Sequence, residues 1–228
     1  MNVLAFDTCL GAVSTAAGRR GPDGQWQLAT LFDRRVEGHA ESLMPMIGEV
    51  MQRSGLRFSD LDRIAVTAGP GTFTGVRVGV AAARGLALAS GVPTVAASSL
   101  AVMGHRARQV LAASLAGRQV LVAVDAGRGM VYAELAPGEP VLAAPEQAAA
   151  RFAPLPLVVV GSGAGPVAEA IAAAGGAAEA LLPDLEPDAC DLAVMAADLV
   201  PAAPLRPLYL RPPDVRPQAG KSLPRALP

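Results

Sequence analysis

The sequence predicts an α/β fold built from two related halves, and two observations carry this prediction. Residues 3–16 (VLAFDTCLGAVSTA) and 121–134 (LVAVDAGRGMVYAE) share a pattern: an apolar strand ending in Asp, a turn with Gly four residues later, and a β-rich return strand. Elsewhere, strand-like apolar runs lead into helical patterns. At 228 residues, 52% of them hydrophobic, the chain can bury a sizeable core.

The elements of the first half follow from local patterns. Residues 2–6 and 12–17 are apolar runs separated by a glycine turn, which predicts a hairpin. Apolar side chains recur at helical spacing over 39–51, before Ser54-Gly55. The other expected elements are a strand over 62–67, a helix over 76–90 with Thr72 or Thr74 as its cap, a strand over 93–97 and a connecting helix over 100–115.

The second half restarts with strands and ends in a proline-rich segment. A buried-strand pattern over 157–160 opens into the turn 161–165 and an Ala-rich helix. Recurring prolines from residue 201 exclude a continuous helix or central strand there. We expect a subdomain over 1–103, a smaller one over 104–200 whose last helix packs back on the first, and a tail over 201–228. In this tail, 207–211 docks and the residues beyond 213 are mobile.

Charge and cysteine content narrow the classes of function. The formal net charge of −1 gives no global attraction to nucleic acid or anionic lipid. Cys9 and Cys190 are too few for a disulfide framework or a clustered metal site, so a reducing compartment fits. The N-terminus lacks a signal-peptide pattern, and no apolar run reaches the roughly 18 residues of a membrane span. These observations predict a cytoplasmic protein.

The two repeated hairpins supply the main candidate binding site. A strand that ends in Asp beside exposed turn amides suits a phosphate or a metal-bound phosphate, and two such hairpins facing each other would form a nucleotide cleft. Alternatively, each Asp ends its strand and binds local amides. That second interpretation is favoured for Asp125, and both stay open for Asp7. The candidate nucleotide-binding residues are Asp7, Thr8, Gly71, Thr72, Asp125, Gly161 and Gly163.

Other common active-site motifs are missing. The glycine-rich run 69–75 lacks a Gly-Lys-Ser/Thr ending, and the only lysine is Lys221, which excludes a Walker-type NTPase. His39 and His105 lie far apart and form no metal-binding pattern, so we expect no metal site. Ser162 lies in a Gly-Ser-Gly turn with no candidate base nearby in the sequence. A hydrolase triad is therefore not visible.

Three segments resemble the TsaB family: FDTCLGAVSTA (6–16), GHAESLMPMI (38–47) and AVTAGPGTFTGVRVGVAAARGLALASGVPTVAASSL (65–100). The last is the most specific. VDAGRGMVYAEL (124–135) and PLYLR (207–211) are similar more loosely. The resemblance implies a duplicated actin-like fold, the ribonuclease H-like architecture of the ASKHA proteins, with two subdomains.

The resemblance also implies a subunit without catalysis. TsaB proteins are paralogues of TsaD, which transfers a threonylcarbamoyl group to N6 of adenosine 37 in tRNA. In TsaD, a helix after Gly-Ile-Pro carries two metal-binding histidines in an HxxxH pattern. Aligned through Gly91-Val92-Pro93, those positions here are Ser99 and Met103. Neither replaces an imidazole, so the resemblance implies a non-enzymatic accessory subunit with no metal.

The partners implied by the resemblance are TsaD, as a heterodimer, and the ATPase TsaE, with tRNA reached indirectly through the complex. No cofactor of its own is implied, and ATP or ADP with Mg²⁺ would bind at a subunit interface. Methionines on the helix over 39–51 suit an adaptable partner surface, although core packing explains them equally well. The candidate interface residues are His39, Glu41, Leu43, Met44, Met46, Ile47, Val76 and Val80.

Two other functions remain open. The same fold hosts sugar and acetate kinase-like phosphotransferases, and an older interpretation of this family is a glycoprotease. A kinase lacks a convincing catalytic Asp or Glu here, and a metalloprotease lacks ligands. A stand-alone homodimer, formed through the same helix faces, is the second alternative.

Overall fold

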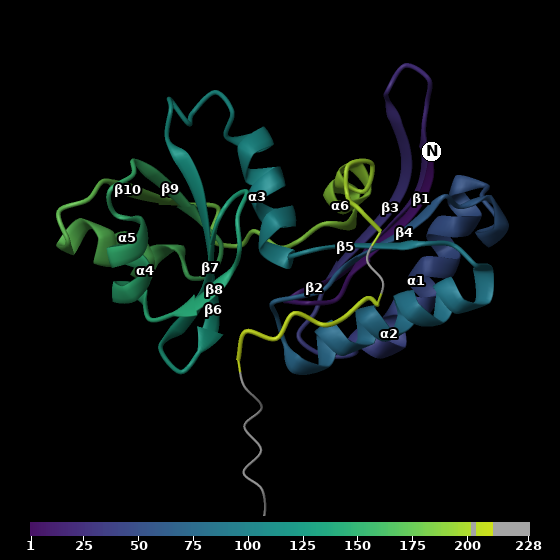
Figure 1. Cartoon of the computed structure of the whole chain (residues 1–228), viewed down its shortest axis with the longest axis horizontal. Coiled ribbons are helices and arrows are strands. Elements are labelled where there is room, and N and C mark those ends of the chain that lie inside the picture. Colours follow the sequence, from purple (N-terminus) through teal and green to yellow (C-terminus); the bar gives the residue numbers. More distant parts are fainter. Residues whose placement is uncertain (202–203, 212–228) are drawn as a thin grey trace, which may run out of the picture.

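The computed structural model describes residues 1–201 and 204–211, which form two lobes (Figure 1). The first lobe contains β1 (Asn2–Asp7), β2 (Ala12–Arg20), β3 (Trp26–Arg34), α1 (His39–Ser54), β4 (Arg63–Thr67), α2 (Phe73–Ser90), β5 (Thr94–Ala97) and α6 (Ala189–Met195). α3 (Ser99–Val110) lies between the lobes. The second lobe contains β6 (Gln119–Gly127), β7 (Met130–Leu135), β8 (Val141–Ala143), α4 (Pro145–Phe152), β9 (Leu157–Val160), α5 (Ala164–Ala173) and β10 (Ala178–Leu181).

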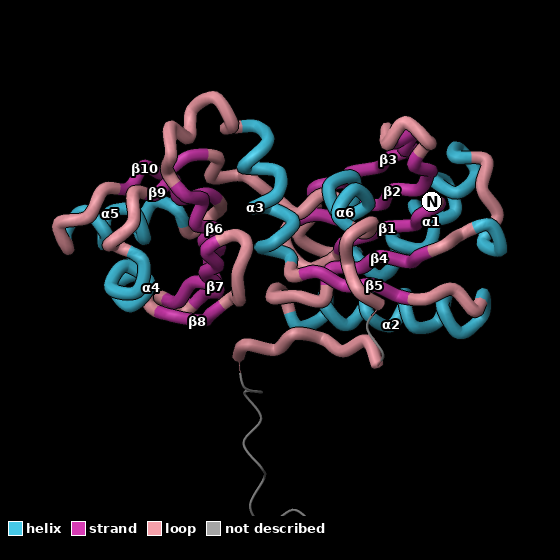
Figure 2. Tube along the Cα trace, turned by 45° about the horizontal axis from the view of Figure 1, so that its top comes forward, coloured by secondary structure: helices cyan, strands magenta, loops and turns pink. Residues whose placement is uncertain are grey.

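The two sheets have the same topology. The first has the strand order β3-β2-β1-β4-β5, and the second, read from its other edge, has the order β8-β7-β6-β9-β10 (Figure 2). In each, the first three strands along the chain pair antiparallel and the last two join in parallel. The hairpin repeated in the sequence is therefore part of a larger repeat that includes the whole five-stranded sheet. The expected duplicated actin-like α/β fold is confirmed.

Strand alternation assigns the two faces of each sheet to different helices. In β1, Leu4 and Phe6 face the cluster formed with α1 and α2, whereas Val3 and Ala5 face the cluster formed with α6. In the second lobe, one face packs against α4 and α5, and the other packs against α3. α3 and α6 therefore lie between the sheets, and α1 with α2 forms an outer layer.

Several boundaries differ from the sequence-based expectation. α2 begins at Phe73 instead of residue 76, because the Thr72 side chain caps it by accepting a bond from the Gly75 amide at 3.1 Å. α3 ends at Val110 instead of 115, where tighter turns take over before Ala116 and Gly117 adopt positive φ. β3, β8, β10 and α4 were not anticipated.

The last described segment, residues 204–211, runs along the lower edge of the molecule in Figures 1 and 2. Leu205 is buried in the first lobe's core, and the Leu208 amide donates to the Ala68 carbonyl at 2.7 Å. The expectation of a mobile tail beyond residue 213 lies outside the described residues. Within the described part of the chain, no helix has the length and hydropathy of a bilayer-crossing segment.

Candidate functional site

Asp7 ends β1 as a fully buried acid. Its Oδ1 accepts bonds from the Thr67 hydroxyl and from the Cys9 amide at 3.2 Å, while Oδ2 has no partner among the described residues. Burial raises the pKa of Asp7 to about 7, against the opposing effect of the bonds from Thr67 and Cys9. Burial therefore favours the protonated form of Asp7, and no surface of it is open to a ligand.

The glycine-rich run 69–75 packs directly over this acid. The Thr72 amide donates to the Cys9 carbonyl at 2.8 Å, and the Thr8 hydroxyl donates to the Gly75 carbonyl at 2.6 Å. A Cβ on Gly71 would lie 2.2 Å from the Cys9 carbonyl oxygen, and one on Gly75 would lie 2.0 Å from that of Thr8. These glycines serve the close contact of two backbones.

The second hairpin is arranged differently from the first. Asp125 is exposed, its Oδ1 accepts from the Gly127 amide at 2.7 Å, and its own amide donates to the Ser162 hydroxyl at 3.0 Å. The Gly161 and Gly163 amides donate to the carbonyls of Leu182 and Ala123. The glycine turn after β9 therefore uses these two amides within the protein and does not present them to a phosphate.

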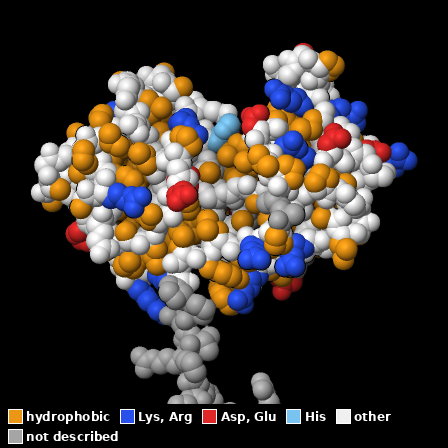
Figure 3. Space-filling view, in the orientation of Figure 1, with side chains coloured by type: hydrophobic (Ala, Val, Ile, Leu, Met, Phe, Trp, Pro, Cys, Tyr) orange, Lys and Arg blue, Asp and Glu red, His pale blue; other side chains and the backbone are white. Residues whose placement is uncertain are grey.

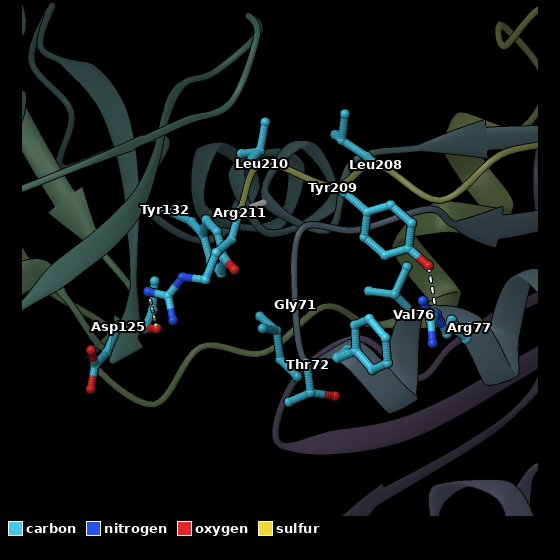
Figure 4. Close-up of a pocket in the computed structure, with 13 residues that line it drawn as sticks. Gly71, Thr72, Val76, Arg77, Asp125, Tyr132, Leu208, Tyr209, Leu210 and Arg211 are labelled. Atoms are coloured by element: carbon cyan, nitrogen blue, oxygen red, sulfur yellow. Dashed lines mark hydrogen bonds between the residues drawn. The ribbon is translucent and has the colours of Figure 1, made fainter. Parts of the chain in front are cut away.

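A cleft of about 490 Å³ separates the two lobes. Figure 4 shows Arg77, Val76 and Tyr209 on one side, and Asp125, Tyr132 and Arg211 on the other. The full lining is Leu10, Gly71, Thr72, Phe73, Val76, Arg77, Asp125, Ala126, Tyr132, Leu208, Tyr209, Leu210 and Arg211. Most of these side chains are aliphatic or aromatic, as in many small-molecule sites, and two guanidinium groups face one carboxylate.

Three side chains form a stack at one wall of this cleft. The Arg77 guanidinium lies 3.3 Å from the Phe73 ring centroid and 5.6 Å from that of Tyr209, and its Nε donates to the Tyr209 hydroxyl at 2.7 Å. The two rings stack at 6.2 Å. The stack therefore joins the start of α2 to residues 204–211 through aromatic and cation–π contacts.

The structure brings together only part of the expected nucleotide site. Gly71, Thr72 and Asp125 line the cleft, whereas Asp7, Thr8, Gly161 and Gly163 do not. The nucleotide-binding role of these residues stays a prediction. In the described residues, no group of three or more His, Cys, Asp or Glu side chains could hold a metal ion.

Sequence reasoning missed most of the cleft lining, which includes Leu10, Phe73, Tyr132 and the side chains of 208–211. No local motif marks these residues, because they meet only when the two lobes and the C-terminal segment assemble. Residues 207–211 were expected to dock and also belong to the family resemblance, but neither observation placed their side chains in the cleft.

The candidate interface residues need correction. Leu43, Ile47, Val76 and Val80 are at most 3% exposed and face the first lobe's core, because they lie on the inner stripes of α1 and α2. His39 is also buried, with its Nε2 2.9 Å from the Leu10 carbonyl. These five side chains therefore cannot form a docking surface.

The remaining three differ in exposure. Met46 is half-buried against the core, and Glu41 and Met44 face solvent.

Ser99 and Met103, which the resemblance aligns with the TsaD histidines, are both fully buried. The Ser99 hydroxyl donates to the Pro70 carbonyl at 2.5 Å, so its single donor is used inside the protein. Met103 packs in the cluster that joins α3 to the second sheet. Neither side chain offers a metal ligand to the cleft.

Two sheets of identical topology on either side of a cleft define an actin-like α/β protein. A family model described as TsaD, tRNA N6-adenosine threonylcarbamoyltransferase, matches residues 35–184. The tRNA threonylcarbamoyladenosine biosynthesis protein TsaB of Escherichia coli is 34% identical over 132 residues, covering 58% of this chain and 53% of that protein. The chain belongs to the TsaD family and, within it, to the TsaB proteins.

Two relatives match nearly the whole chain. An uncharacterized protein of Mycobacterium tuberculosis is 34% identical over 224 residues, which is 95% of each chain. A crystal structure from Pseudomonas aeruginosa, of an uncharacterized protein with similarity to peptidase YeaZ, has a TM-score of 0.75 at 30% identity and covers 92% of this chain and 99% of that one. By contrast, the matched region spans about half the length of the first two TsaB relatives, 53% and 52%.

Proposed function

We propose that this chain is a non-catalytic scaffold subunit in the biosynthesis of threonylcarbamoyladenosine in tRNA. It pairs with TsaD, takes part in recruiting the ATPase TsaE, and reaches tRNA through the complex, in the cytoplasm. One observation carries the proposal. A chain of the TsaD family has a hydrogen-bonded hydroxyl, Ser99, and a buried thioether, Met103, at the two positions where the resemblance implies metal-binding histidines in TsaD. The name of the E. coli relative supports the pathway.

Co-purification and complementation test this proposal. Tagged chain expressed with the TsaD of its own organism should co-purify with it. It should also restore threonylcarbamoyladenosine in a strain depleted of the native gene, measured by mass spectrometry of digested tRNA. If the folded protein neither co-purifies with TsaD nor restores the modification, the proposal is wrong.

The outer layer of α1 and α2 is the proposed TsaD-binding surface. It carries large apolar side chains in solvent, with Met44 49% and Leu88 88% exposed. Small residues Gly48, Ala81 and Gly85 are exposed on the same two helices and would allow a partner helix to approach closely. Apolar anchors beside small residues suit helix-on-helix packing with a related subunit.

We predict that Leu88→Glu raises the Kd for TsaD by about tenfold or more, because association would bury an unpaired carboxylate. Val110→Glu is the matched control. Val110 is a 56% exposed apolar residue on α3, away from the α1–α2 layer. Surface plasmon resonance on immobilised TsaD measures both variants, after circular dichroism shows that they fold. Equal weakening by the two variants would contradict the proposed surface.

We further propose that the chain requires no cofactor of its own and that ATP or ADP with Mg²⁺ binds at an interface with another subunit. In the isolated chain, buried Asp7 and the occupied amides of Gly161 and Gly163 do not fit a metal-bound phosphate. Titration calorimetry with ATP and MgCl₂ should give no binding heat for the isolated chain and measurable heat for its assembly with TsaD and TsaE. Tight binding by the chain alone would favour the phosphotransferase alternative.

A further inference from the structure

Residues 204–211, called the strap, are fixed firmly to the first lobe. Leu205 is 4% exposed and belongs to that lobe's core. The Leu208 amide bonds to the Ala68 carbonyl at 2.7 Å, and the Leu208 carbonyl oxygen would lie 2.9 Å from a Cβ on Gly69. Tyr209 joins the stack with Phe73 and Arg77. Three kinds of contact therefore hold this end of the strap.

The strap then reaches the second lobe with fewer contacts. Leu210 packs at the edge of the α3–β6 cluster. One terminal nitrogen of Arg211 donates to the carbonyls of Ala126 and Gly127, at 2.9 and 3.2 Å. Both carbonyls belong to the end of β6. Among the described residues, one half-buried guanidinium and one leucine therefore attach the strap to the second lobe.

Because of its position, the strap connects the two lobes across the cleft. The chain also crosses between the lobes at α3 and again at residues 182–188, where the Gly11 amide donates to the Glu186 carboxylate at 3.1 Å. Those crossings lie above the strap in Figures 1 and 2, whereas the strap follows the lower edge. Four consecutive strap residues, 208–211, line the cleft. Opening the lobes about the other two crossings would stretch the Arg211 bonds.

The strap and the neighbouring helix α2 form a positively charged edge of the molecule. α2 and residues 204–211 carry four arginines and no acidic residue. Basic side chains gather along this lower edge in Figure 3. The bonds from Arg211 to the carbonyls of Ala126 and Gly127 place one of these four cations on the second lobe.

We infer that the strap is a latch that keeps the two lobes closed over the cleft. Arg211 makes the contact that can be released, and Tyr209 keeps the strap bound to α2. Release at Arg211 lets the lobes separate and exposes the apolar cleft wall formed by Leu10, Val76 and Tyr132. The inference concerns the isolated chain and does not depend on the proposed partner.

Pulsed electron spin resonance on the full chain tests the latch. Spin labels are placed at Gln52→Cys on α1 and Glu169→Cys on α5, both exposed positions on different lobes, with Cys190→Ser and the fully buried Cys9 left in place. With the native strap we expect one narrow distance distribution. In Arg211→Ala, the ratio of molecules at longer distances to molecules at the native distance should rise by about tenfold or more. This is the factor expected for losing a hydrogen bond from a charged donor.

The matched control is Arg206→Ala, which removes an exposed arginine of the same strap that makes no hydrogen bond or ion pair to the described part of the second lobe. A milder second variant, Tyr209→Phe, keeps the ring beside Phe73 and loses only the bond to Arg77. It should broaden the distribution less than Arg211→Ala does. If Arg211→Ala fails to fold, the Tyr209→Phe comparison decides. If folded Arg211→Ala, or Tyr209→Phe in its place, gives the same distance distribution as Arg206→Ala, the latch is overturned.

Discussion

Gly75→Ala should lower the free energy of unfolding by about 3 kcal/mol, the upper part of the range for overpacking. The new Cβ would lie 2.0 Å from the Thr8 carbonyl oxygen and 2.7 Å from the Thr72 hydroxyl oxygen. The first of these is backbone and cannot rotate away. Relief would require α2 to move from the β1–β2 turn, which would lengthen the bond from the Thr8 hydroxyl to the Gly75 carbonyl. Urea unfolding followed by circular dichroism measures the change.

Gly85→Ala, on the same helix, separates this clash from a general glycine effect. Beyond the neighbouring residues and backbone of α2 itself, no atom of the described residues lies within 4 Å of a Cβ at Gly85. Helix propensity favours alanine over glycine by about 1 kcal/mol. We therefore expect that variant to be unchanged or slightly more stable. The interpretation of the glycine-rich run as a backbone contact fails if Gly75→Ala is as stable as Gly85→Ala.

The fold was predictable where local patterns suffice. The repeat of Asp7 and Asp125 at strand ends identified the duplicated hairpins. Thr72 and Thr74 were the two cap candidates before a helical run, and Thr72 is the cap. β3 was missed although Leu28 and Ala29 are half-buried on it, because its pattern includes exposed and half-buried residues on both faces. Edge strands that pack on one partner give a weaker alternation than central ones.

The site was predictable only in part, because burial is a property of the assembled chain. Asp7 and Asp125 have the same place in the repeated pattern, yet one is enclosed by the run 69–75 and the other is exposed. Likewise, helical periodicity identified Leu43 and Ile47 as one stripe but could not say that the stripe faces the sheet. Tyr209 and Arg211 reach the cleft through contacts more than 80 residues apart in sequence.

Asp7→Asn should remove a pH dependence of stability that the buried acid confers. Burial raises the pKa of Asp7 from 3.8 to about 7, so the folded state binds more protons than the unfolded state between these values. The free energy of unfolding therefore falls as pH rises from about 4 to about 7, and it levels off above. The full shift corresponds to about 4 kcal/mol. Between pH 5 and pH 8, Asp7→Asn should gain about 2–3 kcal/mol relative to the unmodified chain.

Urea unfolding at pH 5, 6, 7 and 8 measures this difference, and comparison at each pH cancels the groups common to both chains. One of these is Asp191, whose pKa burial raises to about 6 and which acts in the same direction. Asp125→Asn is the matched control, because it changes the equivalent carboxylate of the second hairpin, which is exposed to solvent. The pH-dependent gain predicted here belongs to Asp7→Asn and should exceed any gain of this control. If Asp7→Asn kept a constant difference, Asp7 would be ionised in the folded protein across this range, and a cation from solvent or a partner would have to reach its free Oδ2.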